Sequence, residues 1–101
     1  MRTASVFVAL AALLTPFVAA DLHHSGVCVN GKNVYNKDAT VKACEAYLKR
    51  NTGNKQHEQC PDCVMKNIGN LDVCNSAGWH IGGKELSQYC KDAGASGSLA
   101  N

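Results

Sequence analysis

Six cysteines are the residues of this chain with the most definite chemistry. They are Cys28, Cys44, Cys60, Cys63, Cys74 and Cys90. The stretches between them hold 15, 15, 2, 10 and 15 residues and do not resemble one another, so the spacing does not indicate an internal repeat. An even number of thiols in a short secreted chain indicates a disulfide framework. We therefore predict three disulfides, whose pairing the spacing leaves open.

The start of the chain predicts that these thiols are secreted. Met1-Arg2-Thr3 is basic, Val6–Leu14 is apolar, and Val18-Ala19-Ala20 ends in small residues, as in a secretory signal peptide. The apolar run is far shorter than the roughly 20 residues that cross a bilayer. We predict a signal peptide over residues 1–20 and a single disulfide-rich domain over residues 21–101. No transmembrane segment is expected.

The cysteines could serve two purposes other than disulfide bonding. Cys60-Pro61-Asp62-Cys63 has the C-x-x-C spacing of thiol–disulfide catalysts, but it lacks their βαβ context, and Pro61-Asp62 would form a plain turn. Cys60, Cys63 and Cys74, with His80 or Cys90, could form a zinc site. Secreted thiols oxidise, so we interpret the motif as structural, paired internally or with other cysteines, and expect no cofactor.

A different metal site could form at the mature N-terminus. Cleavage before Asp21 would leave Asp21-Leu22-His23 at the start of the chain. The α-amine, two backbone amides and the third-position imidazole would offer four nitrogens in the square-planar geometry that suits Cu(II). The hypothesis is that the secreted protein binds Cu(II) there.

Catalytic residues are hard to assemble from this sequence. His57, Glu58, His80 and Arg50 could be sorted into the acid, base and charge-stabilising roles of a small ribonuclease. His57 and Glu58, however, are neighbours and would point apart in a strand. We therefore predict that the protein is not an enzyme and has no catalytic residues.

Trp79 and His80 are the candidate binding residues. They lie in the glycine-rich segment from Ser76 to Gly83. Tryptophan is enriched at the energetic centres of interfaces, yet the only tryptophan of a small domain could equally fill its core. Both interpretations stay open at this point.

The first elements expected around these residues are a hairpin and a helix. Val27–Val29 and Lys32–Tyr35 read as strands around an Asn30-Gly31 type I′ turn. A helix is predicted over Ala39–Arg50, with Asp38 as its N-cap. Val41, Cys44 and Leu48 lie three and four positions apart on that helix. They are therefore predicted to form its buried face, with Tyr47 beside them.

The second half repeats the order of hairpin and helix. Val64–Lys66 and Leu71–Cys74 read as strands, followed by a helix over Lys84–Asp92 and a flexible tail from about Gly94. This order predicts an α+β domain, a short antiparallel sheet with two helices on one face. Cys44 and Cys90, on the buried faces of the helices, should bridge either to the sheet or to the Cys60/Cys63 turn.

Charge excludes some partners. The formal net charge is +2, and it falls to +1 once Arg2 is removed. Such a chain has no polybasic face for nucleic acid, so none is expected as a partner. The same near-neutrality counts against an antimicrobial or toxin-like protein, which would use a cationic amphipathic face.

Residues 21–29 (DLHHSGVCV), 59–63 (QCPDC) and 73–83 (VCNSAGWHIGG) resemble the biotrophy-associated secreted proteins of blast and anthracnose fungi. The resemblance covers nearly all of the predicted mature chain. It implies an effector released while a fungus colonises living plant tissue, and it supplies no catalytic residues.

We accordingly expect a monomeric, secreted, non-enzymatic fungal effector and virulence protein that binds a host plant protein or cell-surface component. Its expected location is the host apoplast or the plant–fungus interface, or the host cell after uptake. The alternatives are an antimicrobial or toxin-like protein and, less favoured, a ribonuclease-like hydrolase.

Overall fold

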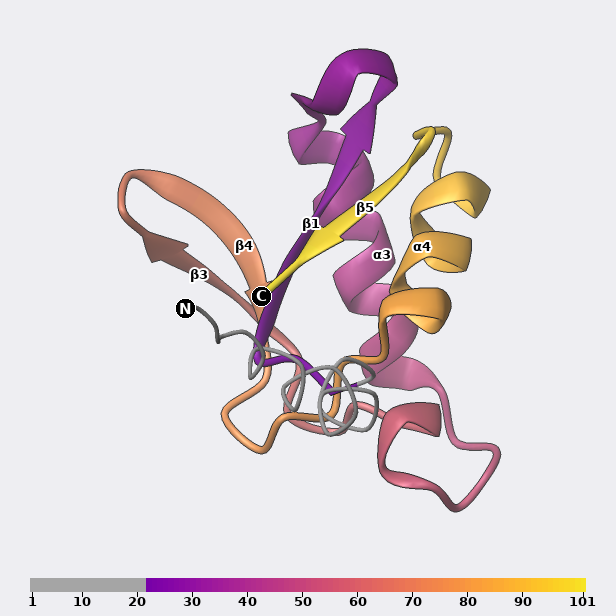
Figure 1. The fold of residues 1–101 in the computed structure, drawn as a ribbon. Coiled ribbons are helices and arrows are strands. Elements are labelled where there is room, and N and C mark those ends of the chain that lie inside the picture. The colour runs from indigo at the N-terminus through magenta and orange to yellow at the C-terminus, as the bar shows by residue number, and fades with distance from the viewer. Residues whose placement is uncertain (1–21) are drawn as a thin grey trace, which may run out of the picture.

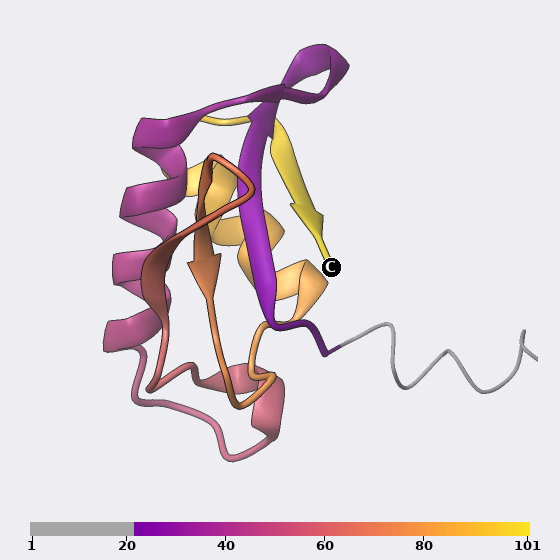
Figure 2. The same ribbon diagram turned by 90° about the vertical axis from the view of Figure 1, so that its left-hand side faces the viewer.

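The computed structural model describes residues 22–101, so the predicted signal peptide and Asp21 lie outside the described residues. In the described part of the chain, two α-helices pack against a five-stranded antiparallel sheet, which confirms the predicted α+β class. Both helices cover the same face of the sheet (Figures 1 and 2). No helix among these residues has the length and apolarity needed to cross a membrane.

The sheet is built around β1 (Ser25–Asn30). Gly26 pairs with both Cys74 of β4 and Ala100 of β5, so these two strands lie on opposite edges of β1. The strand order is β2-β1-β4-β3, and every pairing is antiparallel. The other strands are β2 (Val34–Tyr35), β3 (Val64–Ile68), β4 (Leu71–Asn75) and β5 (Gly97–Ala100).

The two hairpins form where the sequence predicts them, but the first turn differs. Positive φ angles occur at Lys32 (64°) and Asn33 (58°), not at Asn30-Gly31, because a short 3₁₀ turn over Gly31–Asn33 lengthens the connection. The β3–β4 hairpin instead turns in two residues, Gly69 and Asn70, with φ angles of 59° and 66°. Glycine and asparagine are the residues that adopt this region most readily.

The first helix, α3 (Lys37–Lys49), begins earlier than predicted. Its N-cap is Asn36, whose side-chain oxygen accepts the Ala39 N–H at 3.0 Å, so the assignment of Asp38 as N-cap was wrong. Asp38 instead lies in the first turn, where its charge favours the helix dipole.

The buried face of α3 also differs from the prediction. Val41 and Leu48 are exposed, at 39% and 42%, although Cys44 and Tyr47 are buried as expected. Apart from Tyr47, small residues make up the buried face. The buried residues of α3 are Ala39, Thr40, Ala43, Cys44 and Tyr47.

The second helix, α4 (Gly83–Asp92), buries Leu86 and Cys90 and is followed by Gly94 at φ +97°. The segment beyond it is not a flexible tail. Residues 97–100 form β5, which pairs with β1 from Gly26 to Val29. Without β5 this edge of β1 would be left unpaired, which is why a glycine- and serine-rich segment is ordered here.

Two of the three disulfides join the helices to the sheet, and the third closes a turn. Cys28–Cys90 links β1 to α4, and Cys44–Cys74 links α3 to β4. Cys44 and Cys90 therefore both bridge to the sheet, as the first of the two predicted alternatives had it. Cys60 and Cys63 pair with each other.

Candidate functional site

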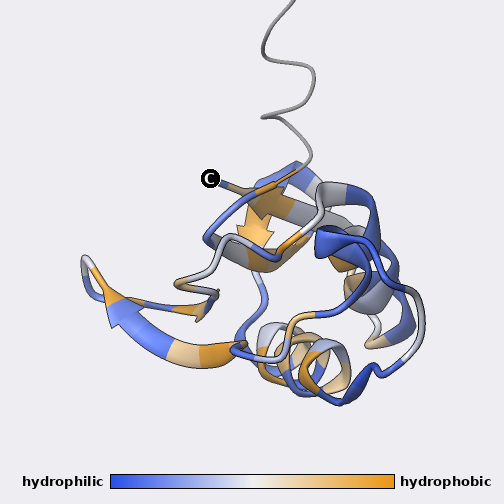
Figure 3. Cartoon of the chain, turned by 90° about the horizontal axis from the view of Figure 1, so that it is seen from below, coloured by the Kyte–Doolittle hydropathy of each residue, from blue (hydrophilic) through white to orange (hydrophobic). Residues whose placement is uncertain are grey.

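Three segments that are distant in the sequence meet at one end of the molecule. They are residues 22–24, 51–63 and 76–83, which we call the loop face; it lies at the bottom of Figure 1. His23 and Ile81 form a β-bridge that joins two of these segments. Figure 3 looks onto this end, where most of the connecting chain is hydrophilic. The fold thus places residues 51–63 beside the Ser76–Gly83 segment that carries the candidate binding residues.

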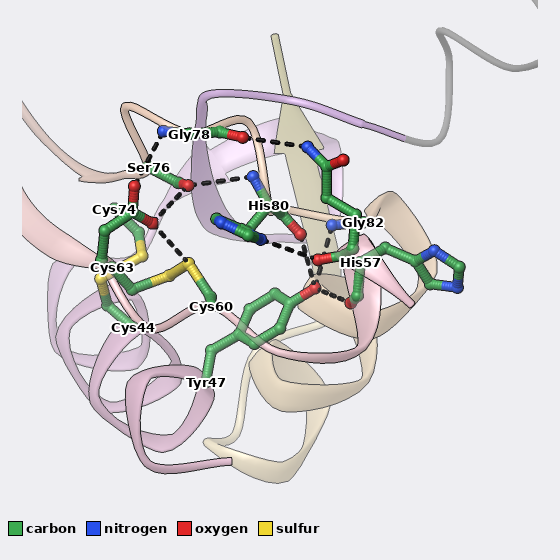
Figure 4. The surroundings of a disulfide bond; sticks show 12 residues. Cys44, Tyr47, His57, Cys60, Cys63, Cys74, Ser76, Gly78, His80 and Gly82 are labelled. Atoms are coloured by element: carbon green, nitrogen blue, oxygen red, sulfur yellow. Dashed lines mark hydrogen bonds between the residues drawn. A yellow bond between two sulfur atoms is a disulfide. The ribbon is translucent and has the colours of Figure 1, made fainter. Parts of the chain in front are cut away.

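Asp62, inside the C-x-x-C turn, organises the neighbouring loop through Ser76 and Gly78, which are labelled in Figure 4. Its carboxylate accepts the Ser76 hydroxyl at 2.6 Å and the Gly78 N–H at 2.8 Å. Burial raises the pKa of Asp62, but these hydrogen bonds and the nearby His80 outweigh burial, and the net pKa lies below its usual value. The charged form of Asp62 therefore holds the loop in place.

Ser76 passes this restraint on to the tip of the loop. It is fully buried, its hydroxyl oxygen accepts the His80 N–H at 2.9 Å, and its carbonyl accepts the Trp79 N–H at 3.0 Å. The Gln56 side chain donates to the carbonyls of Gly78 and Trp79, both at 3.0 Å. The backbone on both sides of Trp79 is thus held from two directions.

Trp79 is presented to solvent by this loop. Its side chain is 47% exposed, and its backbone has a φ of +58°, a left-handed conformation that costs a residue with a side chain roughly 1–2 kcal/mol. The indole packs against the His24 ring at a centroid distance of 4.7 Å. Of the two interpretations of Trp79, the structure excludes the one in which it fills the core.

Tyr47 fastens the loop face to α3 (Figure 4). Its buried hydroxyl accepts the Gly82 N–H at 3.0 Å, and the carbonyls of His57 and His80 lie within its hydrogen-bonding reach. Burial raises the pKa of Tyr47 to about 12. The hydroxyl therefore stays protonated and joins both loops to the same helix.

The residues that could suggest a ribonuclease do not converge. His57 turns toward Glu85, with 3.7 Å between Nε2 and Oε2, whereas Glu58 accepts the N–H groups of Asn54 and Lys55. These backbone hydrogen bonds lower the pKa of Glu58. Arg50 contacts Tyr89, and Nδ1 of His80 faces the Gln56 carbonyl at 3.0 Å. Each group has its own structural partner, so no shared acid–base centre forms.

The C-x-x-C turn also lacks the features of a redox catalyst. Cys60 and Cys63 are buried, at 0% and 3% exposure, and the Asp62 carboxylate lies 3.7 Å from the Cys60 sulfur. A nearby negative charge disfavours a thiolate. The disulfide acts here as a clamp on the turn that carries Asp62. Cys90 pairs with Cys28, so it is not available to the zinc site drawn from the sequence.

The predicted copper site involves Asp21, which lies outside the described residues, together with Leu22 and His23. The His23 N–H donates to the Ile81 carbonyl at 2.7 Å. A four-nitrogen copper site would need this nitrogen deprotonated and turned toward the metal, which would break the bridge to Ile81. Copper binding stays a prediction, and it would require the hydrogen bond between His23 and Ile81 to break.

The family comparison agrees with the resemblance seen in the sequence. Residues 21–98 match the family model described as biotrophy-associated secreted protein 4. The chain belongs to this family. Membership shows that the protein is secreted and implies an effector role, and the family is not a known enzyme family. No curated protein and no solved structure matched the chain.

Proposed function

We propose that this protein is a secreted effector that binds a component of a living host plant, a protein or a cell-surface molecule, without catalysing a reaction. Membership of the biotrophy-associated secreted protein 4 family supports the setting. The observation that carries the proposal is Trp79: a large aromatic side chain, 47% exposed, on a loop whose backbone is strained and held by hydrogen bonds.

A restrained tryptophan is well suited to recognition. Because the Asp62 and Gln56 contacts already order the loop, binding would cost little further conformational entropy. His24 beside the indole and His80 next in sequence add polar atoms to the same surface. We expect the protein to act as a monomer, with Trp79 as the anchor of the contact.

A shallow hollow next to the Trp79 loop offers a second point of contact. Its volume is about 220 Å³, and most of the residues around it carry polar side chains. The residues around it are Asn54, Lys55, Gln56, Gln59, Pro61 and His80. Hydrogen-bonding groups beside an exposed aromatic anchor match the composition of interface centres and rims.

The test is a binding titration of labelled protein on living plant tissue. Trp79→Ala should weaken binding by about 30-fold, since truncating a central aromatic residue typically costs about 2 kcal/mol. The matched control is Val34→Ala, because Val34 is 57% exposed and pairs with Asn30 at the other end of β1. Equal binding by wild type and Trp79→Ala, or equal losses in both variants, would contradict the proposal.

A further inference from the structure

Three cysteine sulfurs, which come from two different disulfides, form one buried cluster (Figure 4). The Sγ atoms of Cys44, Cys63 and Cys74 all lie within 4.8 Å of one another. Cys60 is bonded to Cys63, and each of the four residues is at most 3% exposed. The Cys60–Cys63 disulfide thus lies beside the Cys44–Cys74 disulfide.

The elements that supply these sulfurs suit a metal ion. Cys44 comes from α3, Cys74 comes from β4, and Cys60 and Cys63 come from a C-x-x-C turn in which the Cys63 N–H donates to the Cys60 carbonyl at 3.1 Å. A zinc–sulfur bond of about 2.3 Å places tetrahedral sulfur ligands about 3.8 Å apart. Once the two S–S bonds are broken, the sulfurs of Cys44, Cys63 and Cys74 already lie within 4.8 Å of one another, and the Cys60 sulfur would have to turn toward them.

We propose that reduction converts this cluster into a four-cysteine zinc site. Two molecules of a dithiol reductant would supply four electrons and four protons, becoming disulfides themselves as both S–S bonds break. Zn²⁺ would then displace the four thiol protons and bind Cys44, Cys60, Cys63 and Cys74. The metal would replace the covalent links between α3, β4 and the turn wherever the protein meets a reducing compartment.

The proposed site differs from the zinc site that the sequence suggested. Cys44, which was not part of that site, is the fourth ligand in place of His80 or Cys90. Cys90 is paired with Cys28, between β1 and α4, outside the cluster. This inference does not depend on the proposed host binding, and each can fail without the other.

The first test uses the wild-type protein, reduced with a phosphine that does not bind metals and then titrated with Co²⁺. We expect one equivalent of Co²⁺ to give thiolate charge-transfer bands and the visible bands of a tetrahedral site, both abolished by Zn²⁺. Alkylation of the zinc-loaded chain should then modify Cys28 and Cys90 and spare the other four cysteines. Absence of the cobalt bands, or uniform alkylation of all six cysteines, would overturn the proposal.

Two variants separate this site from general thiol binding. Cys63→Ser should lose the tetrahedral cobalt spectrum, because the cluster loses a central ligand. The matched control, Cys28→Ser, removes a thiol outside the cluster and should still bind one equivalent with the same spectrum. The opposite pattern, with the spectrum lost only in Cys28→Ser, would contradict the assignment.

Discussion

At the scale of single residues, one carboxylate connects two turns of the loop face. Asp62 lies between two cysteines of a closed disulfide, and it holds Ser76 and Gly78 on the loop that carries Trp79. The disulfide restrains the carboxylate, and the carboxylate restrains the loop. The backbone that carries Trp79 is thus held in part by a carboxylate from a different turn.

Replacing Asp62 tests this dependence. Asp62→Asn keeps the shape of the side chain, but it removes the charge and one acceptor oxygen. We expect the free energy of unfolding at pH 7 to fall by about 1–3 kcal/mol, because one buried donor loses its partner. Chemical denaturation at pH 7 would measure the loss, with Glu45→Gln on the exposed surface of α3 as the matched control.

The pH dependence of this variant is a separate prediction. The folded pKa of Asp62 lies below the ordinary value of 3.8, so its ionised form stabilises the fold above that pH. The contribution disappears as the pH falls through the folded pKa. The difference between wild type and Asp62→Asn should therefore shrink in strong acid. A difference that stays constant from pH 7 to strong acid would show that the Asp62 charge has no part in holding the loop.

At the scale of elements, α3 supports the loop face as well as the core. Its Tyr47 hydroxyl accepts the N–H of Gly82 and lies beside the carbonyl of His57, so both loops are fixed to one helix. The N-terminal end of the helix has a matching role at the sheet. Thr40 accepts the Cys28 N–H at 2.8 Å, in the gap that β2 and β4 leave along β1.

Tyr47→Phe should loosen the loop face while leaving the core packed. Removing the hydroxyl leaves the buried Gly82 N–H without an acceptor, which costs about 1–3 kcal/mol. Amide hydrogen exchange should accelerate at Gly82 more than at Cys28 in β1. Equal protection of Gly82 in wild type and variant would mean that Tyr47 does not hold this loop. Tyr89→Phe is a suitable control, since the ring of Tyr89 packs against Tyr47 on the same side of the molecule.

The elements themselves could largely be predicted from local sequence signals. Both helices and both hairpins follow from periodicity, glycine and asparagine. The predicted N-cap was wrong because Asn36 and Asp38 are both good capping residues. The choice between them depends on where the helix begins, which is at Lys37. The strand β5 was missed because residues 97–100 are ordered by the distant edge of β1, not by their own composition.

The candidate site was predictable only in part. Cysteine and tryptophan stand out as residue types, so the disulfide framework and Trp79 could be found from sequence. The residues that hold the loop could not. Asp62 reaches Ser76 across 14 positions and Tyr47 reaches Gly82 across 35, and no local pattern reports such contacts. The Pro61-Asp62 turn between two cysteines was the only available signal.

At the scale of the whole molecule, the three disulfides have different structural roles. Cys28–Cys90 spans 62 positions and Cys44–Cys74 spans 30, and both tie a helix to the sheet. Cys60–Cys63 spans only 3 positions and shapes a turn. A domain of this size has a small core, so the two long-range links should supply much of its stability.

Removing the bridges one at a time tests this division. In the chain-entropy treatment, closing a 30-residue loop stabilises by about 2 kcal/mol more than closing a 3-residue loop. The Cys44→Ala/Cys74→Ala double variant should therefore unfold more easily than Cys60→Ala/Cys63→Ala by about that amount. Denaturation of both variants without reductant provides the comparison. Equal stabilities would show that loop length does not determine what these bridges contribute.

The most direct test of the central claim is the accessibility of Trp79, the only tryptophan of the chain, to a neutral fluorescence quencher. We predict efficient quenching in the free protein and clear protection when the protein is bound to host tissue. A tryptophan already shielded in the free protein would contradict the described loop. Quenching that is unchanged in the bound protein would contradict the proposal that Trp79 contacts the host component.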